Sequence, residues 1–214
     1  MKFISYFLLC IFSLSHLIAV PVKKKMTSYR PLIILDAGHG GWDHGARIKY
    51  PFCEEKRMAL TTAHYTKRYL EKMGYRVSLT RSRDFYISLP KRVNFANRHK
   101  SEIFVSIHFN SCPNKTAHGI EVFYHNNQNN RIRSLASKKL AEHILKKSAQ
   151  KTKFYSRGIK KGNFFVIRET KMPAILVEGG FLTNPDERKC LRQRTYLDKL
   201  ARGIAEGIDT YIKA

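Results

Sequence analysis

Short apolar runs of strand length alternate with helical stripes along this chain, and that alternation limits the folds it can adopt. The apolar runs that predict buried strands span residues 32–35, 75–79, 102–107, 119–124 and 174–177. The stretches with helical periodicity span residues 56–73, 89–99, 131–147 and 196–212. Together they predict a single three-layer α/β domain, with a mostly parallel or mixed twisted sheet flanked by helices.

Three of the predicted strands end in a side chain that can bind a metal. The first strand runs into ILDAGHGGWDHGA with His39, EIFVSI ends at His108, and AILV ends at Glu178. Because ligands of open α/β sheets bind outside the carboxyl ends of the strands, we expect these side chains to meet. Glu54 and Glu55 precede the first long helix and add two candidate carboxylates.

Two histidines and one carboxylate form the ligand set of a hydrolytic zinc site with an open fourth position. In that position the pKa of a water falls toward ~7, which makes it a nucleophile at neutral pH. A further carboxylate must take the proton of the water and pass it to the leaving nitrogen. The glutamates at a helix start, Glu54 and Glu55, and the glutamate at a strand end, Glu178, are the candidates for the metal ligand and for this proton carrier. Asp36 is a candidate for fixing a histidine tautomer.

The N-terminal residues predict export to the periplasm or cell envelope. Residues 1–21 are typical of a signal peptide, with Lys2, the apolar run FISYFLLCIFSL and small residues before Pro21, and a retained anchor is the less favoured alternative. We expect a basic segment over residues 22–30 and one folded domain over residues 31–214. The three cysteines beyond residue 21 are an odd count without a C-x-x-C pair, which argues against a disulfide framework or a cysteine zinc site. Pairing of Cys53 with Cys112 and three free thiols both stay open.

The chain is strongly basic, with 40 Lys and Arg against 16 Asp and Glu, a formal net charge of +24. Such a charge favours polyanionic surroundings. Export makes nucleic acid the poorest candidate, so we predict contact with an anionic surface of the envelope and no nucleic-acid partner.

Five strings, in order, resemble the zinc-dependent N-acetylmuramoyl-L-alanine amidases of bacterial cell walls (the amidase-3 type). They are ILDAGHGGWDHGA, EEKRMAL, LTRSRDFYISLPKRVNFAN, SIHFNS and AILVEGGFLTNPDE. The resemblance extends from about Pro31 to Tyr211, almost the whole chain beyond the predicted signal peptide. It implies an α/β domain with a mixed sheet, in agreement with the alternation described above.

The resemblance also implies roles for particular residues. His39, Glu55 and His108 match the ligands of one zinc ion per chain, with Glu54 as the alternative to Glu55. Glu178 matches the catalytic glutamate that activates water and protonates the departing nitrogen. His44, where the family usually has proline, and Asn110 are candidates for supporting the site or contacting the substrate.

The implied reaction is hydrolysis of the amide between the lactyl group of N-acetylmuramic acid and L-alanine of the peptidoglycan stem peptide, in wall remodelling or daughter-cell separation. Some family members carry a helical insertion after the SIHFN strand that blocks the site until an activator removes it. Here only residues 111–117 separate that strand from the next, so we predict a monomer that acts on muramyl peptides without an obligate activator.

Three alternatives stay open at this point. A zinc carboxypeptidase or endopeptidase acting on the stem peptide would use the same metal chemistry. A penicillin-sensitive serine enzyme has weaker support from S-x-x-K patterns that begin at Ser88 and Ser148. A non-catalytic wall-binding protein would have no need to retain the metal.

Overall fold

A six-stranded sheet forms the centre of the computed structural model, which describes residues 30–214. The predicted signal peptide lies outside the described residues. In the order in which they lie side by side, the strands are β4 (Arg76–Leu79), β1 (Leu32–Ala37), β5 (Ile103–Asn110), β8 (Ala174–Phe181), β6 (Ile120–Tyr124) and β7 (Ser156–Lys161). All neighbouring pairs are parallel except β8 and β6, so the predicted mixed sheet is confirmed.

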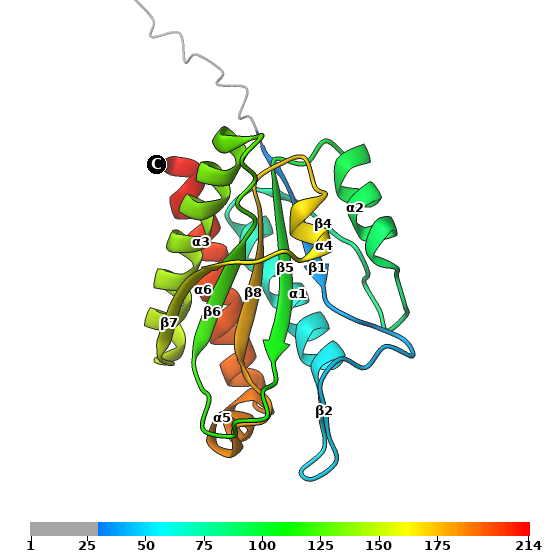
Figure 1. The fold of residues 1–214 in the computed structure, drawn as a ribbon, viewed down its shortest axis with the longest axis vertical. Helices are drawn as coiled ribbons and strands as arrows, with labels where there is room; N and C mark the ends of the chain where they lie inside the picture. Colours follow the sequence, from blue (N-terminus) through cyan, green and yellow to red (C-terminus); the bar gives the residue numbers. More distant parts are fainter. Residues whose placement is uncertain (1–29) are drawn as a thin grey trace, which may run out of the picture.

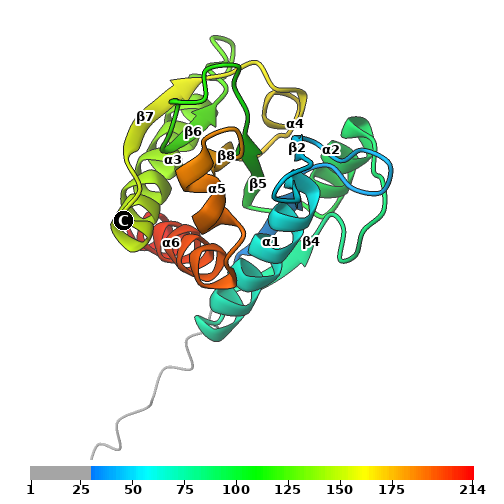
Figure 2. The same ribbon diagram turned by 90° about the horizontal axis from the view of Figure 1, so that it is seen from below.

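Helices cover both faces of this sheet (Figures 1 and 2). One face carries α1 (Glu55–Lys72), α3 (Arg131–Thr152) and α6 (Arg194–Lys213), which pack against one another as well as against the sheet. The other face carries α2 (Leu89–Arg98) and the short α4 (Phe165–Arg168). The helix α5 (Pro185–Leu191) lies beyond the lower ends of β5 and β8 in Figure 1. The predicted three-layer α/β architecture is therefore confirmed.

Two hydrophobic cores hold the layers together, one on each side of the sheet. Along β1, Ile33 and Leu35 belong to the core beneath α1, α3 and α6, and Leu32 and Ile34 belong to the core beneath α2 and α4. All four side chains are buried because successive side chains of a strand point to opposite faces. This explains why the strand is a continuous apolar run instead of an alternating one.

A small antiparallel pair, β2 (Arg47–Ile48) and β3 (Cys53–Glu54), leads from the first strand into α1. The three cysteines of the described residues, Cys53, Cys112 and Cys190, are free, so the pairing of Cys53 with Cys112 is absent. Within residues 30–214, no helix combines the length and the hydropathy that a membrane crossing requires.

Candidate metal centre and active site

Two histidines and one glutamate converge at the carboxyl edge of the parallel strands. His39 follows β1, His108 lies near the end of β5, and Glu55 is the first residue of α1. One carboxylate oxygen, Glu55 Oε1, lies 3.0 Å from His39 Nε2 and 2.8 Å from His108 Nδ1. The ligand atoms of the three residues all lie within 4.8 Å of one another. The structure thus brings together three residues that lie far apart in the chain, with 53 positions between Glu55 and His108 alone.

The backbone at His39 is bent sharply so that its ring turns toward this cluster. His39 has a φ of 58°, a left-handed conformation that is uncommon for residues other than glycine. Gly38 precedes it, and a Cβ on Gly38 would lie 2.3 Å from Cε1 of the His108 ring. Only glycine leaves room there for the two imidazoles, which meet edge to face with centroids 4.9 Å apart.

Asp43 orients the His39 ring. Its two carboxylate oxygens each lie 2.9 Å from His39 Nδ1. Donation of the Nδ1 proton to Asp43 leaves Nε2, the nitrogen that faces Glu55, free to bind a cation. Asp43 stands in the same stretch as His39, four residues later, but sequence analysis assigned this role to another aspartate.

The prediction that Asp36 fixes a histidine tautomer is wrong. The Asp36 carboxylate is buried and accepts hydrogen bonds from Thr80 Oγ1 (2.6 Å), Arg92 Nη1 (2.7 Å) and Ser106 Oγ (2.8 Å). Asp36 is part of β1, and its alternating side chain points into the sheet face beneath α2. The sharp turn comes only after it, so Asp43 reaches the histidine instead.

Two buried arginines fix the carbonyls of the turn. Arg81 donates to the carbonyl oxygens of Ala37 (2.9 Å) and Gly38 (2.7 Å). Arg92 donates to those of Ala37 and His39, each at 2.7 Å. Burial, and then the neighbouring Arg92, lower the pKa of Arg81 to about 10, so Arg81 stays charged at neutral pH. Both arginines belong to the string LTRSRDFYISLPKRVNFAN, which sequence analysis quoted without assigning them a role.

Glu55 and its neighbour Glu54 point to different surroundings. Glu55 accepts further hydrogen bonds from the backbone N–H groups of Ala46 (2.8 Å) and Phe109 (3.2 Å). Burial alone would raise the pKa of Glu55, but the hydrogen bonds with His108 and His39 hold that pKa far below its usual value. The Glu54 carboxylate instead lies 2.9 Å from Arg57 Nε and 3.3 Å from Arg47 Nε.

Burial alone would lower the pKa of His39. The hydrogen bonds and charges of Glu55 and Asp43 raise that pKa by more, so it lies above its usual value. A cation that binds at Nε2 therefore competes with a proton for that nitrogen.

His44 lies beside Glu54 and outside the cluster. Its Nδ1 is 3.0 Å from Glu54 Oε1, and its side chain is 40% exposed. His44 therefore contacts Glu54 and is not one of the three clustered ligand residues.

Glu178 is the register partner of His108 on the neighbouring strand β8. Its Oε2 atom is buried and has no hydrogen-bond partner among residues 30–214. Burial raises the pKa of Glu178 well above its usual value, and the carboxylates of Glu55 and Glu121 raise it further. A raised pKa of this kind is typical of carboxyl groups that act as general acid and base.

Glu121, which sequence analysis missed, is the register partner of Glu178 on the other side, in β6. Its carboxylate accepts hydrogen bonds from Asn110 Nδ2 (2.7 Å), Arg157 Nε (2.8 Å) and Lys160 Nζ (2.5 Å). Burial alone would raise the pKa of Glu121. Lys160 and Arg157 lower that pKa by more, so Glu121 stays ionised. Its negative charge opposes ionisation of Glu178, and Asn110 supports Glu121 from β5.

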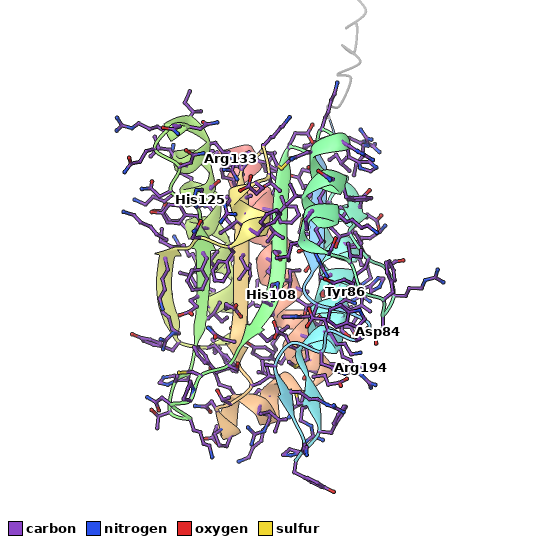
Figure 3. All side chains as sticks on the ribbon, turned by 45° about the vertical axis from the view of Figure 1, so that its right-hand side comes forward. Asp84, Tyr86, His108, His125, Arg133 and Arg194 are labelled. Atoms are coloured by element: carbon purple, nitrogen blue, oxygen red, sulfur yellow. The ribbon has the colours of Figure 1, made fainter. Side chains whose placement is uncertain are left out.

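The donor set fits a zinc ion. Two imidazole nitrogens and one carboxylate oxygen are the ligands of hydrolytic zinc sites, which keep one position open. Around them lie Asp43, which is hydrogen-bonded to His39, and Glu178, whose Oε2 atom has no hydrogen-bond partner in the described part of the chain. Figure 3 shows His108 on β5 in the lower half of the sheet. A helix-flanked sheet with such a cluster at its carboxyl edge has the arrangement of a metal-dependent hydrolase.

Comparison with known proteins gives the family. The model of the Amidase_3 family, N-acetylmuramoyl-L-alanine amidase, matches residues 33–210. The N-acetylmuramoyl-L-alanine amidase AmiA of Escherichia coli is 32% identical over 228 residues, which cover 88% of this chain and 78% of AmiA. The probable cell wall amidase LytH of Staphylococcus aureus is 35% identical over 202 residues, which cover 92% of this chain and 64% of LytH.

Solved structures agree with this assignment. An N-acetylmuramoyl-L-alanine amidase from Clostridium difficile 630 superposes with a TM-score of 0.82 at 38% identity, over 87% of this chain and 99% of that one. The catalytic domain of the amidase CwlV from Bacillus (Paenibacillus) polymyxa superposes with a TM-score of 0.79, also at 38% identity, over 86% and 98% of the two chains. The chain belongs to the N-acetylmuramoyl-L-alanine amidase family.

Proposed function

We propose that this enzyme hydrolyses the amide between the lactyl group of N-acetylmuramic acid and L-alanine of the stem peptide, with one zinc ion held by His39, Glu55 and His108. The observation that carries the proposal is the convergence of these three side chains beside Glu178, whose buried Oε2 atom lacks a hydrogen-bond partner among the residues that the structure describes. When bound, zinc would polarise the amide carbonyl and lower the pKa of a water.

Glu178 moves the proton in this mechanism. As the water attacks the carbonyl carbon, Glu178 accepts its proton, and as the C–N bond breaks, Glu178 donates a proton to the nitrogen of L-alanine. The products are a lactyl carboxylate and a stem peptide with a free amine. The raised pKa of Glu178 suits both halves of this transfer, because a strongly acidic carboxyl group would be a poor base toward water.

The surroundings of the site support action without an activator. The nine residues 111–119 that join β5 to β6 contain no helix, so no helical insertion covers the site from that connection. We place the enzyme as an exported monomer in the cell envelope, where its net charge of +24 favours anionic surfaces. Its role there is wall remodelling or daughter-cell separation.

The serine alternative has little support from the packing. Ser148 is completely buried, and a Cβ on Gly203 of α6 would lie 2.5 Å from Ser148 Cα. A substrate therefore has no path to the hydroxyl of Ser148. Ser88 is the N-cap residue of α2, which lies on the opposite face of the sheet from α1. Its position therefore does not support a role as the nucleophile of a serine enzyme.

Metal dependence tests the proposed site. The full chain, with no other protein added, is expected to solubilise purified peptidoglycan sacculi. Exhaustive chelation is expected to stop that release, and about one equivalent of zinc per chain is expected to restore it. Dye release from labelled sacculi and the zinc content of the protein measure the two quantities. Release that persists in metal-free protein would contradict the zinc site, and release that begins only when a partner protein is added would contradict the absence of an activator.

A further inference from the structure

An exposed aromatic side chain stands at the tip of the turn that follows His39. The backbone N–H groups and carbonyls of Gly40 and Asp43 bond each other at 2.9 and 3.2 Å, which leaves Gly41 and Trp42 at the tip. The Trp42 side chain is 72% exposed. A large aromatic residue with this exposure contributes little to a hydrophobic core.

Trp42 lies against a second exposed aromatic residue. Its ring stacks on that of Tyr86 with centroids 4.1 Å apart and an interplanar angle of 30°, and Tyr86 is itself 40% exposed. A Cβ on Gly41 would lie 2.7 Å from the backbone nitrogen of Tyr86, so the two loops touch. We call the stacked rings of Trp42 and Tyr86 the aromatic platform.

Hydrogen bonds hold the aromatic platform in place. Asp84 accepts from the backbone N–H of Gly41 (2.7 Å) and from Lys56 Nζ (2.9 Å), and Lys56 Nζ also donates to the Gly41 carbonyl (2.7 Å). The Lys56 side chain is buried and its charge is neutralised by Asp84. The aromatic platform is thus a preorganised flat apolar surface.

The aromatic platform is continuous with the candidate active site. Asp43, which closes the turn below Trp42, is also the residue that holds His39 Nδ1. Figure 3 shows Tyr86 and Asp84 at about the same height along the sheet as His108. The turn that carries Trp42 is therefore joined through Asp43 to the histidine cluster, which places the aromatic platform at the border of the candidate active site.

We propose that the aromatic platform is a subsite for one pyranose ring of the glycan strand. This inference rests on the proposed function, because it assumes a substrate that carries N-acetylated sugars. A pyranose presents a flat face of C–H groups, which can cover the apolar face of an indole, while its hydroxyl and acetamido groups point outward to water.

The chain contains one tryptophan, so the fluorescence of Trp42 reports directly on this subsite. The full chain carrying Glu178→Gln, which prevents turnover, is titrated with glycan oligosaccharides of N-acetylglucosamine and N-acetylmuramic acid that lack stem peptides. The expected result is a saturable shift of the emission to shorter wavelength, because the sugar ring removes water from the indole. A shift with free stem peptide, and none with the peptide-free glycan, would overturn the proposal.

Kinetics on polymeric glycan substrate provide the second readout. Trp42→Ala is expected to raise KM about tenfold and to change kcat less than about twofold, as loss of a stacking contact does. Trp42→Phe, which keeps an aromatic ring, is expected to restore most of the affinity. Tyr50→Ala is the matched control, because Tyr50 is an exposed aromatic residue (91%) in the connection between β2 and β3.

The two proposals fail in different ways. A protein that shows no amide hydrolysis but a glycan-dependent fluorescence shift would overturn the proposed function and leave the subsite intact. Normal amide hydrolysis with an unchanged KM for Trp42→Ala and no fluorescence shift would overturn the subsite alone.

Discussion

Glu178→Gln is expected to lower kcat about 10²- to 10⁴-fold, the usual contribution of a positioned general acid and base. Gln has nearly the same shape as Glu but cannot take a proton from water or give one to the leaving nitrogen. Because the mechanism assigns binding to other residues, KM and the zinc content are expected to change little. Rates of product release and metal analysis of the purified variant measure both effects.

The control for this experiment is Glu142→Gln. Glu142 lies on α3, half exposed, and its nearest ion-pair partner Lys138 is 3.9 Å away. Its replacement makes the same Glu-to-Gln change away from the candidate site and is expected to leave the rate unchanged. If Glu178→Gln retains the rate of the wild type while it holds zinc, Glu178 is not the proton carrier.

Asp36→Asn is expected to lower the free energy of unfolding by about 3–5 kcal/mol, the cost of leaving a buried charge without its partner. The unpaired charge would be that of Arg92, which is 2.7 Å from Asp36 Oδ1 and almost completely buried. Since Arg92 also holds the carbonyl of His39, activity is expected to fall as well. Urea unfolding at neutral pH measures the change in stability.

The effect of Asp36→Asn is expected to depend on pH. Burial alone would raise the pKa of Asp36, but Arg92, Thr80 and Ser106 hold that pKa below its usual value. The carboxylate therefore stabilises the fold fully above its unfolded-state pKa of about 3.9, and this contribution is lost as the pH falls through the folded-state value. The difference between wild type and variant should thus be constant from pH 7 to about 5 and shrink below about pH 4.

An exposed ion pair supplies the comparison. Asp186 lies 3.2 Å from Lys189, and both side chains are mostly exposed. Asp186→Asn is expected to cost less than about 1 kcal/mol at any pH. An equally small cost for Asp36→Asn would show that the buried network does not support the turn that carries His39.

The positions of His39, His108 and Glu178 could be predicted because each stands at or just after the end of a buried apolar run, although β5 and β8 themselves continue to Asn110 and Phe181. In a parallel sheet those ends meet, so a local pattern was enough to predict a shared site. The partner of His39 was not predictable in this way. Asp36 and Asp43 are both near His39 in the chain, and the left-handed backbone at His39 decides which one reaches its ring.

Other parts of the fold lacked a local signal. The edge strand β7 has the sequence SRGIKK, which is polar and has no clear alternation, and it forms by pairing with β6. The antiparallel pairing of β6 with β8 sets Glu121 beside Glu178, and no pattern in the sequence encodes that register. Glu121 and the two arginines of the turn were therefore found only in the structure.

The masses of the products test the proposed reaction most directly. Muramyl peptides are incubated with the full chain and zinc, and the products are identified by mass spectrometry beside a chelated sample. We expect an intact stem peptide that begins with L-alanine and carries a free amine, together with a glycan whose lactyl groups end in free carboxylates. Release of terminal D-alanine, or of fragments cut within the stem peptide, would contradict it and assign the same metal centre to a peptidase.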